Sequence, residues 1–250
     1  MKKYKLLACN VFQRELCALL ANSPDIVDPE FLELGLHASP EVLREALQSR
    51  IDAASGTTPG GAGYDAILLG YGLCGNGLVG IVARSVPLVL PRAHDCCTIL
   101  LGSRSEFMTR FGDIPSAAWT SAGYIERGTQ YLRSSILGQT TGLGLEYAEL
   151  VEKYGDENAV FIWETLHPEL HETKLRFIEM PGTEGLGYAD AMRERAKVEN
   201  LEFELIPGSI RILASLIGGG VGDDFLVVPP GSAIHSAYDN EAILRAGEAP

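Results

Sequence analysis

The sequence predicts an α/β fold with parallel or mostly parallel sheets and flanking helices. Short aliphatic runs alternate with amphipathic helical stretches in the first half of the chain, and a similar order returns in the second half. Such alternation is typical of parallel sheets that are covered by helices. Of the 250 residues, 46% are hydrophobic and 21% are charged, which is enough apolar material for a globular core.

In the first half we expect four strands, separated by helices. The strands are predicted at residues 5–11, 26–34, 65–70 and 86–90, and the helices at 15–21, 39–54, 78–84 and from Asp95 through Arg110. The start of the second helix is the clearest signal, because Ser39 can cap it, Pro40 suits its first turn and Glu41 adds an early acid.

The second half repeats this order less regularly. Strands are predicted at residues 159–163, 175–180, 201–206 and 225–228, and helices at 145–154, 188–198 and 209–216. We therefore expect two pseudo-equivalent Rossmann-like halves around a cleft, an N-terminal α/β half at 1–115 and a C-terminal one at 116–250. The tail after Tyr238 is expected to be poorly ordered.

Charge and hydropathy exclude several classes of partner. With 33 acidic and 20 basic side chains, the net charge is −13, which disfavours binding to nucleic acid or to anionic membrane surfaces. The apolar stretch 78–90 is shorter than the roughly 18 residues of a membrane span, and no signal-peptide core follows the basic N-terminus. We expect a cytoplasmic protein with a small-molecule ligand, and a homodimer is the commonest oligomer for such a chain.

The cysteines provide the main functional clue. An odd number of five, without an export signal, argues against a disulfide framework. Cys9 lies at the carboxyl end of the first predicted strand, Cys74 lies in the loop that leaves the third, and His94 and Cys96 lie in the loop that leaves the fourth. Because carboxyl ends of parallel strands share one edge, these four side chains are candidate ligands of one metal ion. Thiolates with imidazole favour zinc, with iron as the second choice.

The alternative for these cysteines is burial, since cysteine is among the most buried residue types. We expect Cys17 and Cys97 to be core residues, because each lies in an apolar helical stretch.

A glycine-rich turn surrounds Cys74. Residues 70–75 match G-x-G-x-x-G between a strand and a predicted helix, which permits a dinucleotide-binding hypothesis. No suitable acid follows a well-formed next strand, so we favour a loop whose glycines permit positive φ and present Cys74. Gly72, Gly75 and Asn76 are the candidate cofactor-binding residues, with an anion at Asn76 or at the start of the next helix.

A polar cluster follows the predicted strand at 159–163. Glu164 directly follows this strand and is the candidate general acid or base. His167 and His171 would share a helix face, but Pro168 interrupts the H-E-x-x-H pattern of metal helices, so we expect capping and solvated roles for them.

Longer motifs resemble a known family. Four segments together resemble the domain of unknown function 1638 (DUF1638) family, namely Ala8-Cys9, Tyr71-Gly72-Leu73-Cys74-Gly75-Asn76-Gly77, Arg92 through Ser103 and Asp224 through Gly231. The resemblance extends over nearly the whole chain. It implies a link to corrinoid-dependent methyl transfer, and thus a corrinoid or a corrinoid protein as a partner. Where the family pattern has one cysteine after His94-Asp95, this chain has Cys96-Cys97, so either sulfur could face the site.

Two functional hypotheses lead, and a nucleotide-dependent oxidoreductase that uses the glycine turn is a third possibility. The leading one is a zinc-thiolate enzyme that activates a thiol or transfers a methyl group, with Glu164 as proton acceptor. The alternative is a non-catalytic accessory protein that binds a small ligand, a metal or a corrinoid.

Overall fold

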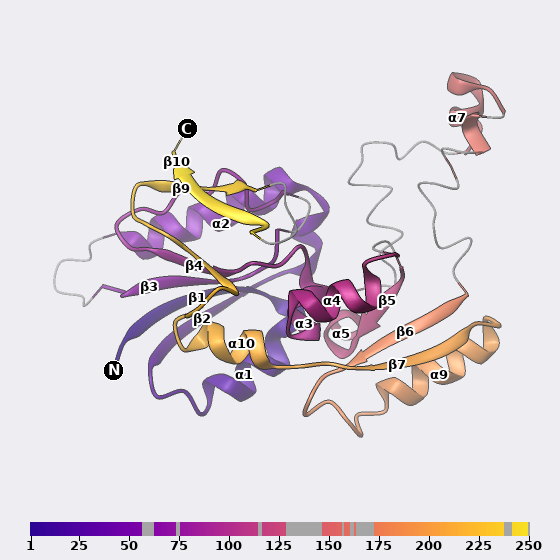
Figure 1. Ribbon diagram of the computed structural model, residues 1–250, viewed down its shortest axis with the longest axis horizontal. Helices are drawn as coiled ribbons and strands as arrows, with labels where there is room; N and C mark the ends of the chain where they lie inside the picture. The colour runs from indigo at the N-terminus through magenta and orange to yellow at the C-terminus, as the bar shows by residue number, and fades with distance from the viewer. Residues whose placement is uncertain are drawn as a thin grey trace.

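The computed structural model shows a mixed α/β protein with one large, mostly parallel sheet (Figure 1). It describes residues 1–56, 63–73, 76–114, 117–128, 147–156, 158–160, 163, 173–237 and 242–249. The α/β fold class predicted from the sequence is confirmed at this level.

The large sheet has five strands in the order β2-β1-β3-β4-β8. The first four are parallel and β8 is antiparallel to β4. Their bounds are β1 Lys3–Cys9, β2 Ile26–Leu32, β3 Ala66–Gly70, β4 Leu88–Pro91 and β8 Phe225–Val228. Every residue of β3 and β4 is buried, as expected for central parallel strands with both faces covered.

Helices cover both faces of this sheet. Helices α1 (Gln13–Leu20) and α10 (Arg211–Ile217) lie on one face, and α2 (Pro40–Ser55) lies on the other (Figure 1). Helix α2 buries Leu43, Leu47 and Ile51, which are spaced by four residues and therefore form one apolar stripe.

A second sheet of three parallel strands lies beside the first. Its order is β5-β6-β7, with β5 at Trp119–Ser121, β6 at Lys174–Glu179 and β7 at Glu202–Pro207. Helix α9 (Tyr188–Val198) packs against β6 and β7. The remaining elements are η1 (Asn10–Phe12), η2 (Leu34–Ala38), α3 (Cys96–Leu101), α4 (Arg104–Phe111), α5 (Ala122–Arg127), α7 (Tyr147–Tyr154), β9 (Ser232–Ser236) and β10 (Leu244–Glu248).

Three of the predicted elements are wrong. Residues 76–80 form turns rather than the start of a helix at 78–84, because backbone groups there bond to β9: Gly80 N donates to Ile234 O at 2.8 Å and Ala83 N to Ser232 O at 2.9 Å. The helix predicted from Asp95 through Arg110 is broken at Gly102, whose φ of 81° is left-handed. Ser103 then caps a second helix.

The third wrong element is the strand at 159–163. Residues 158–160 and 163 are helical, and Ala159 N donates to Gly155 O at 2.9 Å in the helical spacing. A short apolar run is compatible with either structure, and only its surroundings decide between them.

Part of the tail after Tyr238, which was expected to be poorly ordered, forms a strand. Residues 244–248 form β10, which pairs antiparallel with β9. Ile243 and Leu244 are buried in the main core, and this apolar contact fixes the end of the chain.

The two pseudo-equivalent halves are not confirmed. Helix α10 and strand β8 come from the second half of the chain, but α10 covers the five-stranded sheet and β8 extends it. The division at 115/116 stays a prediction.

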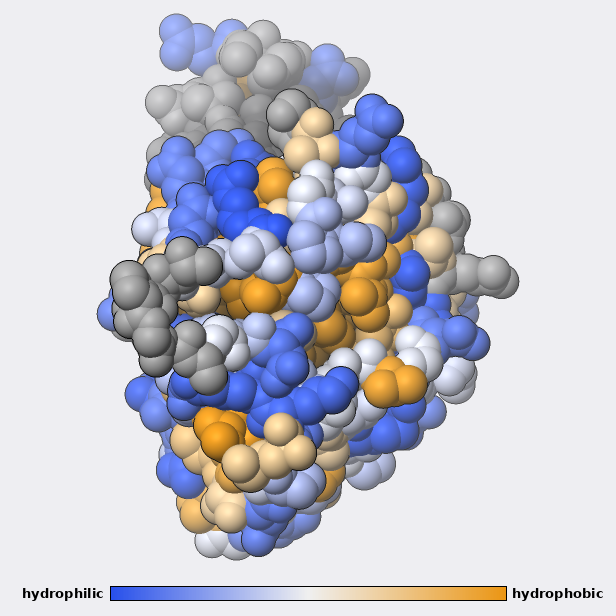
Figure 2. Space-filling model, turned by 90° about the vertical axis from the view of Figure 1, so that its left-hand side faces the viewer, coloured by the Kyte–Doolittle hydropathy of each residue, from blue (hydrophilic) through white to orange (hydrophobic). Residues whose placement is uncertain are grey.

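Hydrophobic and hydrophilic residues are interspersed on the face of the molecule shown in Figure 2. In the part of the chain that the structure describes, no helix combines the length and the hydropathy needed to cross a bilayer.

Candidate functional site

Three parallel strands bring the predicted site residues to one edge of the large sheet. Ala8 of β1 is in register with Gly70 of β3, and Leu68 of β3 with Val89 of β4. The carboxyl ends of these strands therefore lie side by side. Cys9 ends β1 and is buried, and the segments that begin at Tyr71 and Arg92 leave β3 and β4 at the same edge. This edge is where ligands bind in open parallel sheets.

The loops after β3 and β4 contact each other through their backbones. Leu73 N donates to Ala93 O at 2.8 Å. A Cβ at Gly72 would lie 2.9 Å from both Cα and N of Asp95. The φ of Gly72 is not in the left-handed region, so close approach, rather than the expected positive φ, is what requires glycine at this position.

Asp95 fixes the start of helix α3. Its Oδ1 accepts hydrogen bonds from Thr98 N at 3.1 Å and Thr98 Oγ1 at 3.4 Å. Cys96 and Cys97 follow as the first two helical residues, and both are buried. The cap therefore fixes where the Cys96 backbone sits relative to Gly72.

His94 is half-buried, and its ring lies against α4. The ring centroids of His94 and Phe107 are 6.4 Å apart, with the planes tilted by 40°. Among the described residues, no three His, Cys, Asp or Glu side chains are grouped closely enough to hold a metal ion. Cys9, His94 and Cys96 are thus at one edge without forming a complete ligand set by themselves.

Several predicted site residues lie outside the described residues, namely Cys74, Gly75, Glu164, His167 and His171. Asn76 is described and exposed, with a left-handed φ of 71°, and its carbonyl accepts a hydrogen bond from Arg44 at 3.4 Å. The helix N-terminus proposed as an anion site after Asn76 is absent from the described residues 76–80, which form turns.

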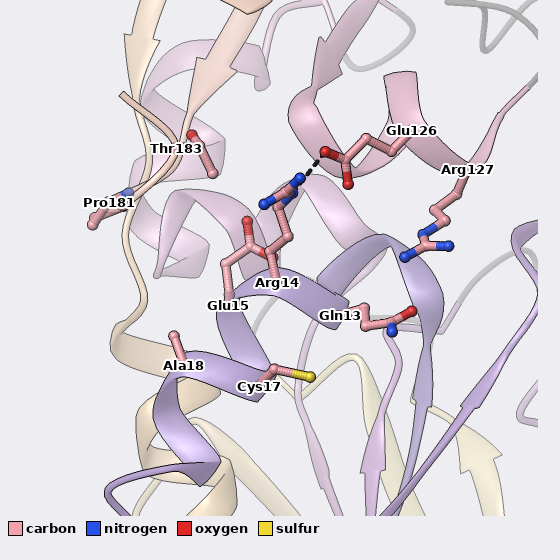
Figure 3. A pocket seen from close by; sticks show the side chains of 10 residues that line it. Gln13, Arg14, Glu15, Cys17, Ala18, Glu126, Arg127, Pro181 and Thr183 are labelled. Carbon is pink, nitrogen blue, oxygen red and sulfur yellow. Dashed lines mark hydrogen bonds and ion pairs between the residues drawn. The ribbon is translucent and has the colours of Figure 1, made fainter. Parts of the chain in front are cut away.

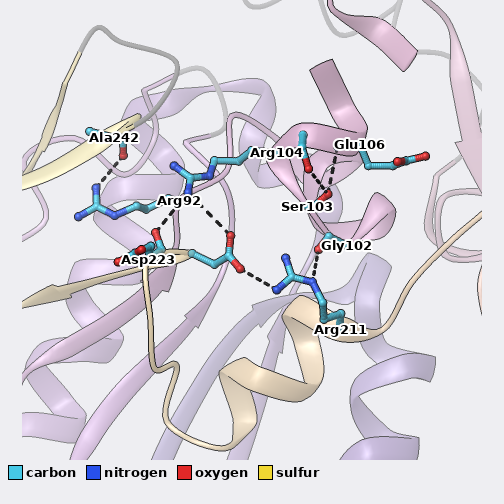
Figure 4. A network of polar contacts seen from close by, with 10 residues as sticks. Arg92, Gly102, Ser103, Arg104, Glu106, Arg211, Asp223 and Ala242 are labelled. Atoms are coloured by element: carbon cyan, nitrogen blue, oxygen red, sulfur yellow. Dashed lines mark hydrogen bonds and ion pairs between the residues drawn. The ribbon is translucent and has the colours of Figure 1, made fainter. Parts of the chain in front are cut away.

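An arginine network anchors the loop that carries His94 and Cys96 (Figure 4). Arg92 donates to the carbonyl oxygens of Ala242, at 2.7 Å, and of Leu244. Nearby, the Arg211 guanidinium donates one hydrogen bond to Gly102 O and one to the Asp224 carboxylate, each at 2.7 Å. The ends of β4 and α3 are thereby tied to β10, α10 and β8.

The carboxyl ends of β1 and β5 also meet. A Cβ at Gly123 would lie 1.8 Å from Val11 O, so the first turn of α5 rests directly on the backbone of η1. Three side-chain oxygens at this junction are buried, namely Asn10 Oδ1 after β1, and Thr120 Oγ1 and Ser121 Oγ in β5. None of them has a hydrogen-bond partner in the described part of the chain. This junction is therefore a second polar region.

One acidic residue near this junction was not among the site residues predicted from the sequence. Glu15 is only 4% exposed and lies in the first turn of α1. It falls on the same helical stripe as Phe12, Leu16 and Leu19, which belong to or pack against the core. An acidic residue among the apolar positions of an amphipathic helix is the sequence signal that could have identified Glu15. Cys17, expected in the core, is instead an exposed free thiol on α1, because it lies off that stripe.

A protein-family model described as "Protein of unknown function (DUF1638)" matches residues 31–217. The chain belongs to the DUF1638 family. The expected family is confirmed over residues 31–217, which include the loops that carry Gly72, His94 and Cys96 in this DUF1638 protein, whereas the motif at Asp224 through Gly231 lies outside the match. No match was found among curated proteins or among solved structures.

Proposed function

We propose that this DUF1638 protein is a metal-thiolate protein that acts on a small molecule. The metal is zinc, with iron as the second choice, and Cys9, Cys74, His94 and Cys96 are the candidate ligands. The observation that carries the proposal is the backbone contact between Gly72 and Asp95. It joins two loops whose sequences place Cys74 two residues after Gly72 and Cys96 one residue after Asp95.

The donor set fits zinc in its chemistry. Cys9 and Cys96 are buried thiols, and sulfur with nitrogen donors is the set that tetrahedral zinc prefers. In the described structure Cys9, His94 and Cys96 do not group around one point, so binding by the full set requires both Cys74 and a rearrangement of these side chains. When bound, zinc lowers the pKa of a coordinated thiol and keeps it nucleophilic, which suits thiol activation or methyl transfer. Glu164 is the candidate proton acceptor.

The Gly72 contact also bears on the dinucleotide alternative. Backbone of Asp95 fills the space beside Gly72 where a Cβ would stand. Packing is thus a sufficient reason for glycine at this position. We do not propose nicotinamide cofactor binding at residues 70–75.

Metal content tests the proposal directly. Protein purified without added metal is expected to hold about one zinc per chain, measured by plasma mass spectrometry. Cys74→Ser and Cys96→Ser should each lower the retained zinc about tenfold or more, because each removes a thiolate ligand. Cys17→Ser is the matched control, since it removes an exposed thiol from α1 and should leave the content unchanged. Native protein with far less than one equivalent, unaffected by either ligand variant, would contradict the proposal.

An optical titration distinguishes a non-catalytic accessory protein from an enzyme. If the chain itself binds a corrinoid, addition of the protein should change the visible spectrum of hydroxocobalamin in proportion to the amount added, up to one equivalent. An enzyme that meets a corrinoid only on a partner protein should leave the spectrum unchanged and should turn over a methylated thiol or amine when that partner is present.

A further inference from the structure

A pocket of about 420 Å³ has a lining that includes neither Cys9 nor Cys96. Its wall is formed by α1, by the end of α5 and by the loop from Pro181 to Thr183 (Figure 3). These three segments follow the carboxyl ends of β1, β5 and β6, which is the position where α/β sheets bind ligands. The volume is sufficient for a small organic molecule.

Glu15 lines this pocket and carries a buried acceptor atom that is unsatisfied in the described part of the chain. In the view of Figure 3 its carboxyl group points from α1 toward the space below Thr183 and Glu126. Glu15 is 4% exposed, and its Oε2 atom accepts no hydrogen bond within the described part of the chain. A buried carboxyl oxygen without a donor is strongly unfavourable, so a missing partner is the simplest explanation.

The neighbouring arginine does not serve as that partner. Arg14 Nε donates to Glu126 Oε1 at 2.6 Å, and the Tyr188 hydroxyl donates to the same oxygen at 2.6 Å. Burial acts to raise the pKa of Glu126, but the hydrogen bonds from Tyr188 and Arg14 outweigh it and lower the pKa. Arg14 is thus neutralised by an ionised Glu126, and the charge of Glu15 has no ion-pair partner of its own in the described residues.

We propose that this pocket binds a small organic ammonium ion, whose N–H group donates to Glu15. A cation of this kind supplies both the hydrogen bond and the charge that the buried carboxyl group lacks. Ala18, Cys17 and Pro181 offer apolar and weakly polar contacts to the carbon part of such a ligand. The remaining charged groups that face the pocket are Arg14, Glu126 and Arg127. Of these, the first two form a pair and Arg127 is exposed.

Protonation of Glu15 gives the proposal a definite pH dependence. Burial raises the pKa of Glu15 above its ordinary value, and the negative charge of Glu126 adds to this, while its own backbone N–H and Arg14 oppose it. An ammonium ion requires the ionised carboxylate. Its affinity should therefore rise as the pH rises through the pKa of Glu15, and binding below that pKa should release a proton to the buffer.

Ethylammonium chloride is the probe, with sodium chloride at equal ionic strength as the reference. Ethylammonium should raise the thermal unfolding midpoint in a concentration-dependent way, whereas ethanol, which is similar in size but uncharged, should not. Glu15→Gln should weaken ethylammonium binding about tenfold or more, because the charge-assisted hydrogen bond is lost. Glu194→Gln is the matched control on an exposed surface of α9 and should bind like the native protein.

A stability measurement shows whether Glu15→Gln folds. The raised folded-state pKa means that the contribution of Glu15 to stability is fully present below its unfolded pKa and is lost as the pH rises through the folded pKa. Gln does not titrate, so Glu15→Gln does not lose this stability. Its free energy of unfolding in urea, relative to that of the native protein, should therefore increase as the pH rises through the folded-state pKa of Glu15. If the variant fails to fold, Ala18→Phe provides a second test. It fills the pocket from an exposed position and should abolish ethylammonium binding without removing the carboxyl group.

Three outcomes would overturn the proposal. They are equal binding of ethylammonium and ethanol, unchanged binding in folded Glu15→Gln or Ala18→Phe, and binding of ethylammonium that strengthens as the pH falls, because an ammonium ion needs the ionised carboxylate as its acceptor. Cys96→Ser should bind ethylammonium normally, so failure of the zinc proposal and failure of this one are distinguishable.

Discussion

At the scale of single residues, Gly72 is the position on which the candidate metal site depends most. The atoms around it belong to the backbone of Ala93 and Asp95, which cannot move aside as a flexible side chain could. Any side chain at this position must separate the loop that leads to Cys74 from the loop that holds Cys96.

We therefore predict that Gly72→Ala lowers the free energy of unfolding by about 1–3 kcal/mol and lowers zinc retention in parallel. Urea denaturation and metal analysis of the same preparations check this. Gly35→Ala is the control, because a Cβ at Gly35 would meet no atom within 4 Å in the described structure and its φ is not left-handed. A Gly72→Ala protein as stable as Gly35→Ala would show that the two loops are not in fixed contact.

At the scale of helices and strands, the two short helices α3 and α4 offer a matched pair of caps. Asp95 accepts a hydrogen bond from Thr98 N at 3.1 Å, and Ser103 accepts one from Glu106 N at 3.0 Å. Only the first cap lies next to a candidate metal ligand.

Asp95→Ala and Ser103→Ala are each expected to reduce stability by about 1 kcal/mol, because each removes one helix cap. Only Asp95→Ala should also reduce the zinc content, since it releases the start of α3 where Cys96 lies. Asp95→Asn, which can still cap the helix, should restore most of the stability. Equal zinc content in the two alanine variants would show that the position of Cys96 does not depend on its cap.

The sequence predicted the elements that have a strong local signal. The aliphatic runs at 65–70 and 225–228 and the helix start at Pro40 were placed to within a residue or two. It failed where the partner decides the structure: residues 78–84 are not helical because β9 takes their backbone hydrogen bonds. The short strands β5, β9 and β10 were missed because each has too few residues to show a clear strand pattern.

The candidate site was predictable in part. Strand alternation was enough to place Cys9 at the carboxyl end of its strand and Cys96 in the segment after another. It could not show that His94 packs against Phe107, or that Glu15 is buried beside Glu126, because both depend on how helices pack across the sheets.

At the scale of the whole molecule, the C-terminal segment is part of the core. Leu244 is fully buried, and its carbonyl oxygen accepts a hydrogen bond from Arg92, which precedes His94 and Cys96. The end of the chain therefore supports the candidate site through the loop after β4.

Leu244→Ala is expected to cost about 3 kcal/mol of unfolding free energy, because it leaves a cavity in the main core. The neighbouring residue Arg245 is exposed, so Arg245→Ala should change stability by less than about 0.5 kcal/mol. Urea unfolding of both variants measures the difference. A small effect of Leu244→Ala would mean that β10 does not contribute to the core in solution.

The antiparallel pairing of β8 with β4 has a consequence for how the protein is made. Strand β4 ends at Pro91, but its partner begins at Phe225, so more than half of the chain must be synthesised before that edge of the sheet can close. Until then the nascent N-terminal sheet has an apolar strand with open backbone groups, which is prone to pair with other chains. The last strand of the large sheet to leave the ribosome is thus the one that protects the earlier ones from aggregation.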